Sequence, residues 1–98
     1  MKILIVTPAC NEEHHLSDLI KSVLAQSHLP EEWIIVDDGS QDNTSDVIQK
    51  ATINHDWIKY LRKEQTGIRS PGKSVIEAFY FGFLHKTIID YDIIIKLD

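Results

Sequence analysis

Short apolar runs alternate along the chain with segments whose apolar residues recur every three or four positions. The runs at 3–6, 33–36 and 93–95 are continuous and β-prone, the pattern of strands buried on both faces. A shorter run at 58–61 predicts one more strand. Helical spacing between the strands predicts helices over Leu16 to Leu24, Thr44 to Ala51 and Ser74 to Lys86, with Asn11 and Thr44 placed to cap the first two.

The order of these elements predicts an α/β fold of the Rossmann-like type, βαβαβαβ, in one domain over residues 1–98. Strands joined through helices run parallel, with right-handed crossovers. We expect the strand order 3-2-1-4. A ligand crevice should then lie outside the carboxyl ends of the first and fourth strands, where the direction of winding reverses.

Charge and composition narrow the function classes. A net charge of -5 argues against a nucleic-acid surface, although it leaves room for a nucleotide held by one or two cations or a metal. The single cysteine, Cys10, allows no internal disulfide and fits a reducing compartment. No apolar run has the length of a signal-peptide core or a membrane helix. We therefore expect a soluble, cytoplasmic chain.

Polar residues follow the strands at the expected crevice: 8–12 after the first, 37–40 after the second, and Asp98 after the fourth. Successive strand residues point to opposite faces, so Asp37 and Asp38 should have different roles. One can accept hydrogen bonds from the next loop, and the other can reach the crevice and accept the N–H donors of a base. The alternative is that both hold the turn that follows.

A basic loop at 66–73 opens the third helix, where backbone N–H groups together with Arg69 and Lys73 favour an anionic diphosphate. The GxxxxGK spacing of a P-loop occurs from Gly67 to Lys73. A true P-loop follows the first strand of its domain, however, and this loop follows the third, which disfavours an ATPase.

Two motifs resemble the opening of family 2 glycosyltransferases. The segment 8–13 reads PACNEE, similar to the family's P-x-Y-N-E-E, and 36–44 reads VDDGSQDNT, similar to its V-D-D-G-S-x-D-x-T. The segment from Gly72 to Gly82 is similar to a later glycine and basic stretch, and 95–98 resembles the approach to the family's D-x-D motif. The resemblance covers essentially the whole chain and implies part of a GT-A fold.

The resemblance also implies which residues bind the nucleotide. Asp38 would hydrogen-bond the base, Lys73 would lie near the diphosphate, and Asp98 would contact the ribose and the metal. Cys10 departs from the family's aromatic residue, which usually stacks on the base. The implied nucleotide-binding residues are Pro8, Ala9, Cys10, Glu12, Asp38, Gly39, Lys73 and Asp98, with Asp98 also the implied metal ligand.

The implied reaction is transfer of a sugar from a UDP- or GDP-sugar to a hydroxyl of a polysaccharide, lipid or other acceptor, with inversion. Mn²⁺ or Mg²⁺ would be the cofactor. Read this way, 1–98 is the nucleotide-sugar-binding portion of a truncated enzyme, with no catalytic residue inside it. We expect it to be inactive alone and to self-associate through the fourth strand, and the full-length protein can be membrane-associated.

The rival classes are a receiver-like signalling module, which needs an aspartate ending the third strand, and a binding-only remnant.

Overall fold

The computed structural model describes residues 1–63, 73–86 and 90–97. Strands and helices alternate in the predicted order. They are β1 (Ile3–Ala9), α1 (Glu13–Leu24), β2 (Glu32–Asp38), α2 (Thr44–Asn54), β3 (Ile58–Lys63), α3 (Lys73–Leu84) and β4 (Ile93–Lys96).

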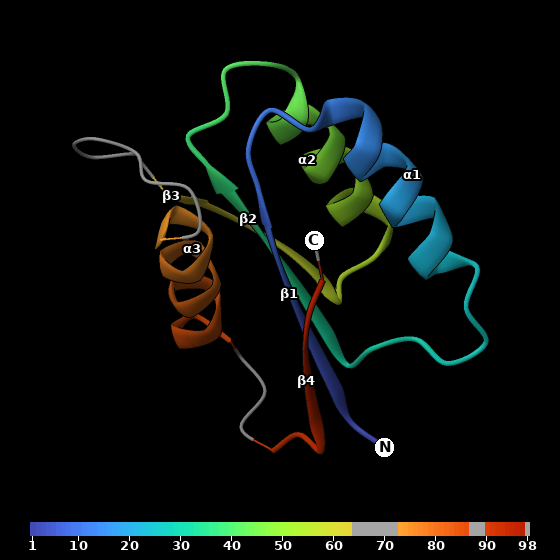
Figure 1. Cartoon of the computed structure of the whole chain (residues 1–98). Coiled ribbons are helices and arrows are strands. Elements are labelled where there is room, and N and C mark those ends of the chain that lie inside the picture. The colour runs from blue at the N-terminus through green and yellow to red at the C-terminus, as the bar shows by residue number, and fades with distance from the viewer. Residues whose placement is uncertain (64–72, 87–89, 98) are drawn as a thin grey trace.

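The strands form one four-stranded sheet in the order β3-β2-β1-β4. Every neighbouring pair is parallel, which confirms the predicted fold class and strand order. Helices α1 and α2 lie side by side on one face of the sheet, and α3 lies on the other (Figure 1). Winding therefore reverses at β1, so the crevice is expected at the carboxyl ends of β1 and β4.

Each face of the sheet has its own apolar core. On the α1/α2 face, Ile5, Trp33 and Ile35 pack against buried residues of both helices. On the α3 face, Val6 and Val36 pack in a second cluster with α3. The helix comes so close there that a Cβ on Gly82 would lie 2.7 Å from Val6 Cγ1 and 2.8 Å from Val36 Cγ2. This contact fixes α3 against the strands that lead to the crevice.

Strand β1 is longer than the sequence predicted, because it continues through Thr7 and Pro8 to Ala9. Proline in a central strand normally interrupts a ladder. Leu97 N donates to Val6 O. Every second residue of β1, counted from Val6, therefore has its backbone N–H and C=O directed toward β4. The next bond on that side would need an N–H from Pro8, which proline lacks. The last β1–β4 partners are accordingly Val6 and Lys96, and the two strands can part at the crevice.

The two predicted helix caps are wrong. Glu12 precedes α1 and Asn43 precedes α2, and neither helix has a side-chain cap hydrogen bond. Asn11 and Thr44 instead hydrogen-bond across to the neighbouring loop. Long-range partners have replaced the local ones that a capping pattern indicates.

Within the described ranges, no helix has the length and apolar character needed to cross a membrane.

Candidate functional site

Two loops meet at the carboxyl edge of the sheet: residues 10–12 between β1 and α1, and residues 39–43 between β2 and α2 (Figure 1). Asn11 N donates to Ser40 Oγ at 3.0 Å, and Asn11 Oδ1 accepts from Gln41 N at 2.8 Å. Asn11 has a left-handed backbone with φ 53°, which asparagine tolerates better than most residues. The second loop therefore fixes the shape of the first.

A second set of bonds ties the start of α1 to the start of α2. Glu12 N donates to Thr44 Oγ1 at 2.9 Å, and Glu13 N donates to Asp42 Oδ2 at 3.4 Å. Asp42 Oδ1 also accepts from the backbone N–H of Thr44 at 3.0 Å and from its hydroxyl. The hydrogen bond from the Thr44 side chain is the main cause that lowers the pKa of Asp42 below 3.8.

Asp37 is the acid that holds the turn, as one of the two was expected to do. Its side chain is fully buried, and its Oδ1 accepts from Ser40 N at 2.9 Å. Its Oδ2 accepts from Arg62 Nη1 at 3.0 Å and from the Tyr60 hydroxyl at 3.2 Å. A buried carboxylate is stable only with such compensation, so the turn and the end of β3 form one polar unit.

Asp38 is the next residue along β2, so its side chain points to the opposite face of the sheet, the one covered by α3. Its side chain is only 3% exposed, and Lys63 Nζ lies 3.8 Å from its Oδ1. The same ammonium lies 3.9 Å from Glu77 Oε2 of α3. The two acids therefore face different partners, as the alternation of strand residues predicted.

Gly39 allows the chain to turn directly after Asp38. Its φ is 70°, a left-handed value that favours glycine. This turn brings Ser40 N back onto Asp37 and places the side chain of Ser40 against Asn11.

The structure brings most of the predicted nucleotide-binding residues to this edge. Pro8 and Ala9 end β1, and Ala9 is 3% exposed with its side chain in the α1/α2 core, so it can offer a ligand only its backbone. Cys10 and Glu12 are both half-buried and flank Asn11. Asp38 ends β2, and Gly39 follows it as the first residue of the second loop.

The remaining predicted residues are not fully described. Lys73 is the first residue of α3, but its side chain is outside the described part of the chain. Asp98 and the basic segment 66–72 lie outside it altogether. Their roles stay predictions.

Sequence reasoning missed the residues that support the turn from β3 and from the second loop. The apolar run at 58–61 includes Tyr60 as part of a short strand but not Arg62, and Asp42 is only one position of the 36–44 motif. The sequence carries only a partial signal, because strand alternation places Ile58, Tyr60 and Arg62 on one face. The register that pairs Arg62 with Asp37 is seen only in the structure.

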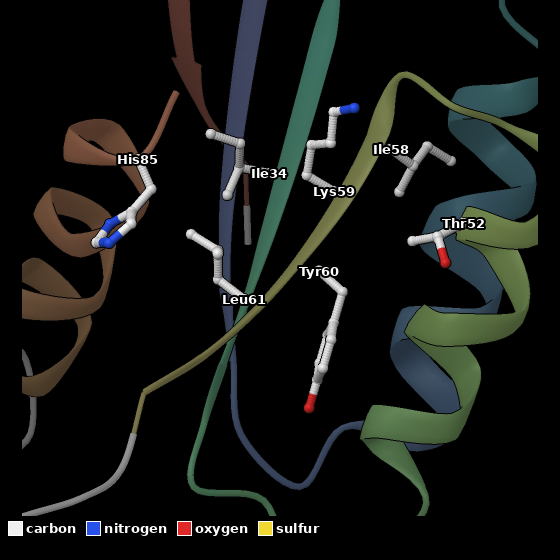
Figure 2. Close-up of a pocket in the computed structure, with 7 residues that line it drawn as sticks. All are labelled: Ile34, Thr52, Ile58, Lys59, Tyr60, Leu61 and His85. Atoms are coloured by element: carbon white, nitrogen blue, oxygen red, sulfur yellow. The ribbon is translucent and has the colours of Figure 1, made fainter. Parts of the chain in front are cut away.

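A hollow of about 440 Å³ lies along β3, away from these loops (Figure 2). It bends around the edge strand, so both faces of the sheet contribute to its wall. Figure 2 shows the Tyr60 ring running along the strand, with its hydroxyl turned toward the ends of β1 and β2. The hollow contains no residue of either loop and is not the candidate site. Its lining residues are Ile34, Thr52, Ile58, Lys59, Tyr60, Leu61 and His85.

The described residues do not by themselves fit a divalent cation. Among residues 1–63, 73–86 and 90–97, no group of three or more His, Cys, Asp or Glu side chains is placed to hold one. A hard cation such as Mn²⁺ or Mg²⁺ needs several oxygen ligands.

Comparison with known proteins gives a consistent result. The family model described as glycosyl transferase family 2 matches residues 4–70. Glycosyltransferase GlyG of Streptococcus pneumoniae is 30% identical over 98 residues, covering 96% of this chain and 31% of that protein. Poly-beta-1,6-N-acetyl-D-glucosamine synthase of Staphylococcus aureus is 40% identical over 60 residues, covering 60% of this chain and 15% of that protein.

Two solved structures share the fold. Glucosyl-3-phosphoglycerate synthase from Mycobacterium tuberculosis, in complex with Mn²⁺, UDP and glucosyl-3-phosphoglycerate, has a TM-score of 0.61 at 24% identity over 99% of this chain and 33% of its own. Mannosyltransferase PcManGT from Pyrobaculum calidifontis, in complex with GDP-Man and Mn²⁺, has a TM-score of 0.55 at 20% identity over 79% of this chain and 23% of its own. The chain thus spans about a third or less of the proteins that it resembles.

Proposed function

This chain belongs to glycosyl transferase family 2, and from that premise we propose that the carboxyl ends of β1 and β2, with the two loops that follow them, bind the nucleotide of a nucleotide-diphospho-sugar donor. The protein that carries it transfers the sugar of that donor to an acceptor hydroxyl. The observation that carries this proposal is the pair of interlocked loops, which hold a nearly buried Asp38 at the carboxyl edge of the sheet. Rigid loops at that edge suit the binding of a flat, polar ligand.

The roles follow from where each residue lies. Asp38 accepts the N–H donors of the base, and Gly39 leaves room beside it. The backbone of Pro8 and Ala9, with Cys10 and Glu12, wraps the base and ribose. Lys73 is assigned to the diphosphate and Asp98 to the ribose and the metal.

UDP and GDP are the proposed donor nucleotides, since the two structurally similar proteins hold UDP and GDP-Man. Their Mn²⁺ ions favour a divalent cation, Mn²⁺ or Mg²⁺, which would act as a Lewis acid for the leaving diphosphate. The Staphylococcus aureus relative favours a polysaccharide acceptor, with lipids and other hydroxyl compounds as alternatives. The transfer is proposed to invert the configuration at the sugar carbon. The protein is proposed to act in the cytoplasm.

Residues 1–98 alone are proposed to be inactive, because they span only 31% of GlyG and 33% of the glucosyl-3-phosphoglycerate synthase chain. Self-association is proposed along β4, an edge strand whose Ile93 and Ile95 are 39% and 36% exposed. Incubation with UDP- and GDP-sugars and Mn²⁺ should yield no transfer or donor hydrolysis, and sedimentation should show mass rising with concentration. Sustained turnover by these residues would show that the active site is misplaced.

The base assignment is tested by titrating UDP and GDP into ¹⁵N-labelled protein. The amide signals of Cys10, Glu12, Asp38 and Gly39 should shift. Asp38→Ala should weaken binding roughly ten- to a hundred-fold, the effect of losing one charge-assisted hydrogen bond of about 1.5–3 kcal/mol.

Two variants control for side effects. Asp38→Asn keeps the side-chain shape beside Lys63 and should also bind weakly, because the charge is lost. Asp46→Ala removes an exposed acid from the first turn of α2 and should bind normally. Equal affinity of Asp38→Ala and the unchanged protein would refute the assignment.

A further inference from the structure

The support for the first loop begins on β3, on the far side of β2. Arg62 Nη1 and the Tyr60 hydroxyl both donate to Asp37 Oδ2, and Arg62 Nη2 lies 3.5 Å from Ser40 O. Asp37 Oδ1 then accepts from Ser40 N, and Ser40 Oγ accepts from Asn11 N. A continuous hydrogen-bonded path therefore runs from β3 through the β2 turn to the loop after β1.

Asn11 is the point where this path has a conformational effect. Its φ of 53° is a left-handed value that costs energy for a residue other than glycine. Two bonds from the second loop, at Ser40 Oγ and Gln41 N, hold it there. If Ser40 moves, Asn11 loses the acceptor for its N–H, and the loop is free to relax toward an ordinary backbone conformation.

Arg62 is suited to fix Ser40 because its guanidinium is a planar fork. One arm holds the carboxylate that accepts Ser40 N, and the other lies at the Ser40 carbonyl. The side chain of Asp37 is fully buried, whereas that of Arg62 is 38% exposed. The arginine therefore covers the polar unit on its solvent side and fixes the orientation of the acid beneath it.

We propose that Arg62, assisted by Tyr60, is a positioning residue for nucleotide binding, and that it acts through Asp37 and Ser40 to set the left-handed shape of the loop at Asn11. The assignment rests on the proposed function, since the loop that it shapes is the one that wraps the base. Arg62 contacts no ligand in this scheme. Its removal should change nucleotide affinity only through the loop.

The test compares Arg62→Met and Arg62→Lys with Lys59→Met. Lys59 lies on the same strand with the opposite parity, so Lys59→Met removes an equal charge without touching Asp37. UDP and GDP are titrated into each folded variant of the 98-residue chain. The three-bond HN–Hα coupling and the Cβ shift of Asn11 report its φ without ligand.

We expect Arg62→Met to weaken UDP or GDP binding about tenfold, the scale of one charge-assisted contact. The Asn11 signals should lose their left-handed values in the same variant. Arg62→Lys keeps the charge but not the fork, so it should recover part of the affinity. Lys59→Met should match the unchanged chain in both measurements.

Tyr60→Phe keeps the ring and removes one donor to Asp37, so it serves if Arg62→Met does not fold. It should weaken binding about two- to threefold, less than Arg62→Met because Arg62 still donates to Asp37, and shift the Asn11 signals in the same direction. Failure of the unchanged chain to bind either nucleotide would overturn the proposed function, and this assignment with it. Nucleotide binding that Arg62→Met and Tyr60→Phe leave intact, with Asn11 unchanged, would overturn the assignment alone.

Discussion

Gly82 gives the most sharply defined stability prediction, because one side chain from each of two strands limits the space next to its Cα. A methyl group there would lie 2.7 Å from Val6 Cγ1 and 2.8 Å from Val36 Cγ2, well inside van der Waals contact. Both valines are fully buried and β-branched, so neither can rotate away. Gly82→Ala must therefore push α3 outward or strain the two strands.

Two opposing terms set the size of the effect. Overpacking a core by one methyl group costs about 1–3 kcal/mol, and close contact with two buried valines places this case in the upper part of that range, at about 2–3 kcal/mol. Alanine gains about 1 kcal/mol over glycine in a helix interior, which offsets part of that cost. We expect Gly82→Ala to lower the free energy of unfolding by about 1–2 kcal/mol. For a domain of this length that corresponds to a Tm lower by roughly 5–15 °C.

Urea unfolding of a double-mutant cycle with Val6→Ala measures the contact directly. Removing Val6 Cγ1 opens space for the new methyl group, so Gly82→Ala should cost less in the Val6→Ala background. The relief should be partial, because Val36 Cγ2 remains at 2.8 Å. A coupling of about 0.5–1.5 kcal/mol is the expected scale for residues in contact. If Gly82→Ala stabilises the protein equally in both backgrounds, α3 does not approach the sheet as described.

Two further predictions concern the loops. The pKa of Asp42 lies below 3.8 in the folded state, chiefly through the Thr44 hydroxyl, so its stabilising contribution is present above that ordinary value and is lost as pH falls through the lowered pKa. Asp42→Asn should therefore be less stable than the unchanged protein near neutral pH, with a difference that shrinks on acidification; a pH-independent difference in urea midpoints would contradict this. Cys10→Tyr should tighten UDP or GDP binding by about 1–3 kcal/mol if position 10 faces the base, whereas Cys10→Ser should not. No gain in folded Cys10→Tyr would show that the loop turns this side chain elsewhere.

The strand order was predictable because it follows from local pattern and general topology. Continuous apolar runs marked the buried strands, and alternation with helices implied parallel pairing. The different roles of Asp37 and Asp38 followed from strand parity alone. These features depend on neighbouring residues or on rules that hold for any sheet.

The polar contacts were not predictable, because they join residues far apart in sequence. Asn11 and Thr44 have the local pattern of helix caps, yet each bonds to the opposite loop. Arg62 meets Asp37 because β2 and β3 pair in one particular register. A shift of that register by one residue would turn Arg62 to the other face, and no local signal excludes it.

The contacts of Asp42 bear on where a diphosphate can bind. Helix N-termini attract anions through free N–H groups and the helix dipole. At the start of α1, Glu12 N and Glu13 N already donate to Thr44 Oγ1 and Asp42 Oδ2. At the start of α2, Thr44 N donates to Asp42 Oδ1.

One internal carboxylate thus occupies the N-termini of both helices on this face, and its negative charge repels a second anion. The interlocked loops are therefore poorly suited to a diphosphate, and this agrees with the proposal that they bind the base and ribose. The remaining helix N-terminus among the described elements is that of α3, which begins at Lys73 on the opposite face. A donor bound as proposed, with its base at Asp38 and its diphosphate toward the start of α3, would keep the diphosphate away from the negative charge of Asp42.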